Sequence, residues 1–307
     1  MNLVEQLYER VRTSPYRKRI VIIGDAMTDH WIQGRLEGCQ DGCTKLMTES
    51  LTTTPGGAAN AMQCLRHWPV NMSLYSYPDE VWPRKFRLVD PSGKIVYRFD
   101  DETSLQTVCR DESTLRHGWQ YNVVGALNMV RHAAGVLLSD YGKGFLTPEV
   151  VAEVVGMCKA RGIPCVADCN RPPALYDGCV LKCNSDYQKA HNRELSRLIY
   201  DADGEPCQQS LVVTAGPLNP AVWDMGVLAR TGPFLPPVRC VNHVGAGDCF
   251  AAHLVLGLAY GMPLTDAATV ANSAGRVYVQ HPRNRAPAPV EVAGDLGTTA
   301  AGPAVRP

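Results

Sequence analysis

Short apolar runs alternate with helical patterns from Tyr121 onward, and this alternation constrains the fold more than any other feature of the chain. Between two of these runs, Thr147-Pro148-Glu149 has the composition of a helix start, and Gly162 ends the helical pattern that follows. The runs of strand length are 135–138, 165–167, 180–182 and 211–213. Strands that alternate with helices form a mostly parallel sheet with helices on both faces. We therefore expect an α/β fold.

Length and charge limit the class of protein. The chain has 307 residues, enough for one large or two small domains, and the regular alternation favours a single α/β unit. Lys+Arg and Asp+Glu both total 30, so no basic field attracts nucleic acid or an anionic membrane. No apolar run approaches the ~20 residues that span a bilayer, and the charged N-terminus is unlike a signal peptide. We expect a cytoplasmic protein without nucleic-acid or membrane partners.

Two glycine turns each run into a helical pattern: Gly56-Gly57-Ala58-Ala59-Asn60 and Gly245-Ala246-Gly247-Asp248. Glycine permits a tight turn whose amides approach an anion, and a following helix adds its free N–H groups. Asp248 lies among these donors, where it could take a proton from an attacking hydroxyl while the amides stabilise a moving phosphate. An ordinary turn with a capping aspartate is the simpler alternative.

A third polar cluster follows the first predicted strand. The apolar run 19–23 ends in Gly24-Asp25, and Asp29 comes four residues later. The run is typical of a buried parallel strand. Ligands of open α/β sheets bind at the carboxyl ends of such strands. Asp25 and Asp29 could each bind a ligand or cap a turn.

The chain has twelve cysteines, and three pairs share a C-x3-C spacing: 39/43, 165/169 and 179/183. Thiolates at this spacing could converge on zinc. Two of the pairs bracket predicted strands, however, and reduced cysteine behaves as a small buried hydrophobe. We expect structural thiols and no metal site.

The glycine turns and the first strand end, in this order, resemble the signatures of the ribokinase-like, phosphofructokinase-B-type carbohydrate kinases. Gly56-Gly57 with Asn60 matches the N-terminal element, and Gly245-Ala246-Gly247-Asp248 matches the C-terminal one. Within the family, segments 24–29, 54–60 and 138–144 most resemble the kinase domain of bacterial D-glycero-D-manno-heptose 7-phosphate kinases. The resemblance runs from about Arg19 to Pro289.

The resemblance implies a domain plan. We expect a ribokinase-like three-layer α/β/α fold with a mostly parallel central sheet and a small β lid. A single kinase domain would cover residues 1–289, with the lid formed from parts of 31–53 and 83–100, and residues 290–307 would be a loose tail. Alternating strands around Pro91-Ser92-Gly93 predict the lid hairpin. Family members often dimerise through the lid, so a homodimer is expected; a surface hairpin without a lid role is the alternative.

The resemblance also implies roles for individual residues. Asp248 would be the general base beside the turn of Gly245, Ala246 and Gly247. Lys143 would reach a phosphate or carry the lid, unless it is simply a solvated lysine. Sugar hydroxyls would be held by Asp25, Asp29, Gly56, Gly57 and Asn60. The ATP side of the pocket would contain Asn184, Tyr187, Thr214, Gly216 and Asn272.

Several departures from the family pattern affect the phosphate side. Tyr187 stands where the family has glutamate, and a phenol is uncharged near neutral pH and cannot organise magnesium-bound water as a carboxylate does. Asp186, one residue away, could substitute. Asn242 and Val244 replace an aspartate and a threonine, which removes a charge and a hydroxyl from the monovalent-cation loop and argues against potassium activation. Asp168-Cys169-Asn170 stands in place of Asp-Pro-Lys, and the segment 76–82 lacks a helix-and-strand unit.

Three functions therefore compete. The first is a kinase that transfers the γ-phosphoryl group of ATP, with Mg²⁺, to the anomeric hydroxyl of a heptose 7-phosphate. The second is a kinase for another sugar or a nucleoside, and the third is a diverged protein that binds sugar or nucleotide with little catalysis. Asp248 with both glycines favours an enzyme, whereas the changes at Tyr187 and Asn242 favour a binder. We expect a sugar kinase of reduced activity.

Overall fold

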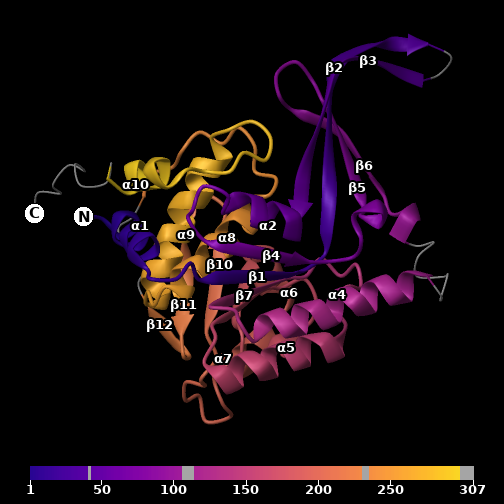
Figure 1. The fold of residues 1–307 in the computed structure, drawn as a ribbon. Coiled ribbons are helices and arrows are strands. Elements are labelled where there is room, and N and C mark those ends of the chain that lie inside the picture. Colours follow the sequence, from indigo (N-terminus) through magenta and orange to yellow (C-terminus); the bar gives the residue numbers. More distant parts are fainter. Residues whose placement is uncertain (41–42, 106–113, 230–234, 298–307) are drawn as a thin grey trace, which may run out of the picture.

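The computed structural model describes residues 1–40, 43–105, 114–229 and 235–297. Its body contains an eight-stranded sheet in the order β12-β11-β10-β9-β8-β7-β1-β4 (Figure 1). The six strands from β4 to β10 are parallel, and β11 and β12 extend the sheet as antiparallel strands. The strands are β1 Arg19–Gly24, β4 Asn71–Tyr75, β7 Gly135–Ser139, β8 Cys165–Asp168, β9 Val180–Asn184, β10 Leu211–Ala215, β11 Leu218–Asp224 and β12 Val227–Ala229.

Successive residues of the central strands enter two different cores, one on each face of the sheet. On β1, Ile20 and Ile22 belong to one core, and Val21 and Ile23 belong to the other. The first core is covered by α1 Leu3–Thr13, α2 Ala58–Cys64, α8 Ala246–Ala259 and α9 Leu264–Val279. The second is covered by α4 Thr114–Val130, α5 Pro148–Arg161 and α7 Asn192–Ile199. The expected three-layer α/β fold is confirmed. Among the described residues, no helix is long and apolar enough to cross a membrane.

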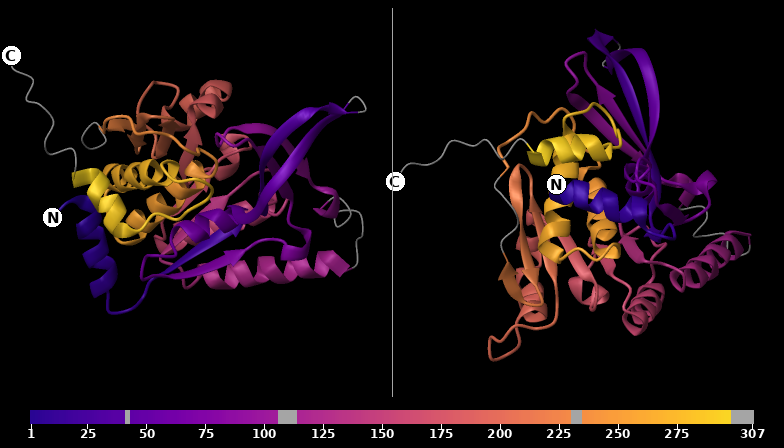
Figure 2. Two further views of the ribbon diagram at one scale, coloured as in Figure 1. Left: turned by 90° about the horizontal axis from the view of Figure 1, so that it is seen from above. Right: turned by 60° about the vertical axis from the view of Figure 1, so that its left-hand side comes forward.

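Residues expected to form a lid build a separate four-stranded sheet in the order β3-β2-β5-β6. Its strands are β2 Ala26–Gln40, β3 Cys43–Gly57, β5 Arg84–Val89 and β6 Ile95–Asp101. Figures 1 and 2 show these strands projecting from one side of the body. The sheet is larger than predicted because β2 and β3 pair along their whole length, from Ala26 opposite Gly57 outward. The lid therefore begins and ends beside the two predicted sugar-binding segments.

The lid sheet has one charged face and one apolar face. Asp29 pairs in register with Lys85, and both side chains are buried on the face toward the body. On the other face, His30, Phe86 and Phe99 stack across three strands with ring centroids 4.6 Å apart at each step. Leu51, Tyr97 and Phe99 remain exposed there. A strand with two such faces buries one face and leaves the other available for contact.

The prediction of a loose tail from residue 290 is wrong for residues up to 297. Helix α10, Pro289–Gly297, buries Val292 and Leu296 against the first core. Arg276 of α9 pairs with Asp295 at 2.9 Å, with both side chains largely buried. A nine-residue helix has little stability of its own. Its order comes from this packing, which the Ala- and Gly-rich sequence did not reveal. Residues 298–307 lie outside the described chain.

The cysteines of the paired strands are buried thiols, as expected. Cys165, Cys169, Cys179 and Cys183 are each at most 5% exposed and are free. The Sγ atoms of Cys165 and Cys179 are 3.5 Å apart. The side chains of Cys39 and Cys43 lie outside the described part of the structure. These four thiols therefore serve as small core residues.

Three short elements complete the chain and do not enter the sheets. They are α6 Ser185–Ala190 and the 3-10 turns η1 Asp79–Val81 and η2 Pro173–Tyr176. Helix α6 follows β9 directly and buries no side chain. It therefore lies at the surface, at the carboxyl end of the sheet.

Gly24 joins the main sheet to the lid at a very close backbone approach. It pairs with Ser139 of β7, and a Cβ at this position would lie 2.0 Å from the Ser139 carbonyl oxygen. Neither backbone can move easily, because both strands are buried in the sheet.

We therefore predict that Gly24→Ala strongly destabilises the protein, because the new methyl group collides with backbone. The matched control is Gly156→Ala in α5, where an added Cβ meets nothing within 4 Å. This control should stabilise the protein by up to about 1 kcal/mol, the helix propensity difference. Urea unfolding of both variants measures the effect, and equal stabilities would contradict the described junction.

Candidate active site

Helix α8 begins at the second glycine turn. Gly245 precedes the helix in a left-handed conformation with φ 84°. A Cβ here would lie 2.4 Å from both Asn60 Nδ2 and Tyr278 Oη, so glycine allows the turn to pack closely against α2 and α9. The first N–H groups of α8 have no acceptor within the helix. Free N–H groups at a helix start can bind an anion.

Asp248 lies in the first turn of α8 and is 3% exposed. Its Oδ2 accepts a hydrogen bond from Asn60 Nδ2 at 2.9 Å, and its Oδ1 accepts one from the Tyr141 hydroxyl at 2.5 Å. Burial raises the pKa of Asp248 to about 7, against the opposing effect of these two donors. A carboxylate with this pKa can both accept and release a proton near neutral pH.

A buried cation lies beside the same glycine turn. Lys182 of β9 pairs with both oxygens of Asp168 at the end of β8, at 2.9 and 3.0 Å. A Cβ added to Gly247 would lie 2.9 Å from Lys182 Nζ, so the ammonium group is next to the turn. Lys182 was not predicted as a site residue. The available signal was a lysine within the apolar run of a buried strand, which is costly without a partner.

Asp25 holds the loop that follows β7. Its Oδ2 accepts the backbone N–H groups of Tyr141 and Lys143 at 2.9 and 3.0 Å, and its Oδ1 accepts that of Phe145 at 3.2 Å. Burial nevertheless raises the pKa of Asp25 above its ordinary value. Asp25, which was predicted to bind sugar hydroxyls, therefore anchors this loop in the structure and directs Tyr141 toward Asp248.

Asp29 lies on the charged face of the lid. Its Oδ1 is 2.5 Å from Arg87 Nη1, and its Oδ2 accepts from Asn284 Nδ2 at 2.9 Å. Gly56 permits this arrangement, because a Cβ there would lie 3.0 Å from Asp29 Oδ2. Gly57 does the same for Asp25, whose carbonyl oxygen would be 2.4 Å from an added Cβ. The predicted glycines and carboxylates therefore meet at the base of the lid.

Lys143 connects the loop after β7 to the lid. Its Nζ lies 2.5 Å from Glu102 Oε1, and Glu102 follows the last residue of β6. Both side chains are about one-quarter exposed. Of the two roles predicted for Lys143, this contact corresponds to carrying the lid.

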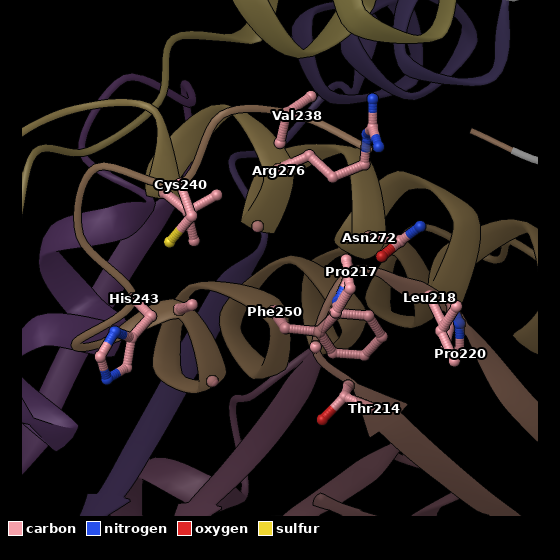
Figure 3. Close-up of a pocket in the computed structure, with 15 residues that line it drawn as sticks. Thr214, Pro217, Leu218, Pro220, Val238, Cys240, His243, Phe250, Asn272 and Arg276 are labelled. Atoms are coloured by element: carbon pink, nitrogen blue, oxygen red, sulfur yellow. The ribbon is translucent and has the colours of Figure 1, made fainter. Parts of the chain in front are cut away.

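A pocket of about 330 Å³ lies beside the glycine turn (Figure 3). Thr214 lies near the end of β10, Gly216 lies in the following turn and Asn272 is on α9, and all three line this pocket. Its wall is mostly apolar and also includes Pro217, Leu218, Val238, Phe250 and Val279. An apolar slot with a few polar groups suits a planar base. Ala246 and Gly247 complete the wall where the helix begins.

Asn184 and Tyr187 lie outside the wall of this pocket. Asn184 is exposed and caps α6 by accepting the Tyr187 N–H at 2.8 Å. The Tyr187 hydroxyl donates to the Arg171 carbonyl at 2.5 Å and so cannot reach the glycine turn. Asp186 points into solvent, with a side chain 89% exposed. Across the described residues, no group of three His, Cys, Asp or Glu side chains is arranged to hold a metal ion.

A second cleft, of about 830 Å³, separates the lid from the loops around residues 242 and 283. Trp31, Lys94 and Arg283 line it, and His243 lines both this cleft and the pocket of about 330 Å³. Asn242 Nδ2 borders the cleft and is buried without a hydrogen-bond partner among the described residues. The two cavities therefore meet at the turn that precedes Asp248.

The geometry places one cavity on the lid side of the turn before α8 and another between α8, α9 and the end of β10. Residues 146–291 match the sequence profile of the pfkB family carbohydrate kinases. The match identifies a pfkB family carbohydrate kinase domain in this part of the chain, and solved ribokinase-like kinases share the fold.

Similar proteins support the assignment over most of the chain. The bifunctional protein HldE of Caulobacter vibrioides is 27% identical over 290 residues, covering 85% of this chain and 60% of its own length. HldE of Geobacter metallireducens is 27% identical over 333 residues, covering 96% and 65%. The chain thus spans less than two thirds of these relatives.

Solved structures confirm the fold at lower identity. Phosphofructokinase-2 of Escherichia coli in complex with fructose-6-phosphate has a TM-score of 0.68 at 14% identity, covering 92% of this chain and 99% of its own. Ribokinase of Arabidopsis thaliana complexed with ribose and ATP has a TM-score of 0.61 at 15% identity, with the same two coverages.

The raised pKa of Asp248 predicts a pH-dependent difference in stability. The folded-state value is about 7, above the ordinary 3.8, so between these values the folded protein binds a proton that the unfolded chain has released. Wild type should therefore lose stability relative to Asp248→Asn as pH rises from about 4 to about 7, by roughly 1.4 kcal/mol per pH unit. Thermal unfolding across this range measures it, and parallel curves would contradict a buried, destabilised carboxylate.

Proposed function

We propose that the chain is an ATP-dependent sugar kinase in which Asp248 is the general base. The observation that carries the proposal is the position of Asp248: buried, with a pKa of about 7, at the start of α8 and beside the Lys182 ammonium group. The helix amides and the lysine supply positive charge where a phosphoryl group would pass. A pure binding protein gains nothing from a base with this pKa.

The reaction follows from this arrangement. Asp248 takes the proton of the acceptor hydroxyl, whose oxygen attacks the γ-phosphorus of ATP. The bond to the β–γ bridging oxygen breaks, and ADP leaves toward the pocket lined by Thr214 and Asn272. The α8 amides and Lys182 stabilise the charge on the transferring phosphoryl group, which is the main task of an enzyme in phosphoryl transfer.

We propose a heptose 7-phosphate, phosphorylated at its anomeric hydroxyl, as the acceptor. Segments 24–29, 54–60 and 138–144, which carry the heptose kinase resemblance, meet at the base of the lid through Asp25 and Gly57. The cleft of about 830 Å³ under the lid has room for a phosphorylated sugar, and Lys94 and Arg283 in its wall could pair with a phosphate. A coupled assay of ADP release across sugars, sugar phosphates and nucleosides tests this choice against other acceptors.

A diverged binding protein is the second candidate, and the phosphate side favours it. The Tyr187 phenol is committed to Arg171, Asp186 faces solvent and Asp168 is neutralised by Lys182. These residues do not form a magnesium site, so Mg²⁺ would arrive with ATP, held mainly by phosphate and water. Its charge would then neutralise the nucleotide phosphates, and no step requires a protein ligand.

We therefore predict that ATP binds both with and without Mg²⁺. The difference between the two affinities should be smaller than in a kinase whose carboxylates bind the metal ion. Calorimetry with ATP, with ATP–Mg²⁺ and with ADP measures this. Lys182→Met should weaken ATP binding, whereas Lys189→Met, at an exposed position on α6, is the control. Absence of ATP binding under both conditions would count against the kinase and against a nucleotide binder.

We also propose that two copies pair through the apolar face of the lid. Leu51, Tyr97 and Phe99 are exposed on that face next to the stacked rings of His30 and Phe86. Leu51→Glu should give monomers in sedimentation velocity, because a charge would be buried at the interface. Val290→Glu, on the exposed side of α10, should leave the dimer intact. A monomeric wild-type protein would refute the pairing.

For Asp248→Asn we predict a loss of turnover of about 10² to 10⁴, the usual contribution of a general base. The amide keeps the shape of the side chain but cannot take the proton, so sugar and ATP affinities should change by only a few-fold. Asp266→Asn, in the first turn of α9, is the matched control and should leave kcat unchanged. An Asp248→Asn variant with intact kcat would remove Asp248 as the base.

A further inference from the structure

The Tyr141 hydroxyl occupies one carboxylate oxygen of Asp248, the proposed base. It donates to Asp248 Oδ1 at 2.5 Å, while the other carboxylate oxygen accepts from Asn60. Asn60 is fully buried and also bonds to the Gly245 carbonyl at 3.3 Å, so it is fixed in the core. Tyr141 is partly exposed toward the lid. Of the two donors, Tyr141 is therefore the one that an incoming molecule can reach.

The backbone of Tyr141 is held firmly, so displacement has to involve the side chain. Asp25 accepts the N–H groups of Tyr141, Lys143 and Phe145, which fixes the loop at Tyr141 and over the four residues that follow it. The ring itself lies between the lid and the base. Lys85 Nζ of β5 is 5.0 Å from its centroid, and a Cβ added to Gly57 would come within 3.4 Å of its edge. Glycine at position 57 thus leaves the ring little hindered.

Lys85 connects the Tyr141 ring to the lid. It is only 8% exposed, and within the described part of the chain its ammonium group makes no hydrogen bond or ion pair. Burial lowers the pKa of Lys85, and the nearby Asp29 opposes that shift. A buried cation over an aromatic face holds the ring by a cation–π interaction. The position of Tyr141 therefore depends on the position of lid strand β5.

We propose that Tyr141 occupies, in the enzyme without acceptor, the hydrogen-bonding position on Asp248 that the acceptor hydroxyl takes during catalysis. This inference rests on the proposed function, because it requires Asp248 to be the base. Burial and the charge of Asp248 raise the pKa of Tyr141, so the phenol donates a hydrogen bond without giving up its proton. Tyr141 acts through Asp248 and is a positioning residue.

The position of Tyr141 would let the enzyme discriminate between a sugar and water as the phosphoryl acceptor. A water molecule on Asp248 could lose its proton to the carboxylate and attack the γ-phosphorus, which would break the β–γ bridging bond and release ADP and phosphate. Water offers one hydrogen bond in exchange for that of Tyr141 and gains little. A sugar brings several hydroxyls and fills the cleft under the lid, so it can displace the phenol. Tyr141 thereby suppresses ATP hydrolysis in the absence of acceptor.

The test is Tyr141→Phe, which removes the hydroxyl and keeps the ring against Lys85. ADP release without acceptor should rise about tenfold or more, the factor of one charge-assisted hydrogen bond. The acceptor KM should fall by a similar factor, and kcat at saturating acceptor should stay within about threefold. Tyr260→Phe is the matched control, because the Tyr260 hydroxyl is buried at the far end of α8 without a partner among the described residues. It should change none of these values.

A second readout requires no turnover. Loss of the Tyr141 donor should raise the pKa of Asp248 above about 7, while Asn60, Lys182, Asp168 and Tyr278 stay in place around it. In proteins that carry Tyr141→Phe, the stability difference between Asp248 and Asp248→Asn should therefore keep changing up to a higher pH than it does with Tyr141 present. An unchanged profile would show that the phenol does not bond to the carboxylate and would overturn the proposal.

The outcomes separate the two claims. If wild type releases no ADP with any acceptor, the proposed function fails. If wild type turns over but Tyr141→Phe leaves acceptor-free hydrolysis and KM unchanged, the kinase stands and the role of Tyr141 is refuted. If Tyr141→Phe lowers kcat by a hundredfold or more with no rise in hydrolysis, Tyr141 takes part in proton transfer and does not restrain it. Circular dichroism of each variant confirms that it is folded.

Discussion

The carboxylate of Asp25 is the interaction on which the rest of the site depends. It accepts three backbone N–H groups of the loop after β7, and its own backbone bonds to Ser139 and Ala58 at 3.0 and 3.1 Å. One residue thereby joins the main sheet, the lid, helix α2 and the loop that carries Tyr141. Three amide donors offset much of the cost of burying a charge. A short polar side chain at the end of a central strand can thus organise elements that are far apart in sequence.

The site keeps several charges out of water, and each buried carboxylate has a different partner. Asp29 has Arg87, Asp168 has Lys182 and Asp140 has Arg171, whereas Asp248 has only neutral donors. Burial raises the pKa of Asp168, and the Lys182 ammonium group opposes that shift, whereas Asp248 has no cation bonded to it and its pKa rises to about 7. Neutral donors thus leave Asp248 able to accept a proton near neutral pH. Perturbed groups of this kind are concentrated at functional sites.

The sequence predicted those parts of the site whose structure depends on nearby residues in the chain. The glycine turns and Asp248 at a helix start follow from backbone conformation and strand–helix order, whereas the positions of Thr214 and Asn272 were expected only from the family resemblance. Lys182 and Tyr141 could not be assigned in this way, because they reach the turn only through sheet order and the loop set by Asp25. The direction of Tyr187 depends on a distant carbonyl of Arg171. Helix α10 was missed because tertiary packing, and not helix propensity, orders it.

The two terminal helices of the described chain lie side by side, on the part of the body away from the lid (Figure 1). Asn2 caps α1 and also donates its side-chain amide to the Ala293 carbonyl of α10 at 3.0 Å. Mechanical load applied to these two helices would enter the molecule at this shared patch, away from the lid. A tether or fusion partner attached to these helices would therefore leave the cleft under the lid open to solvent.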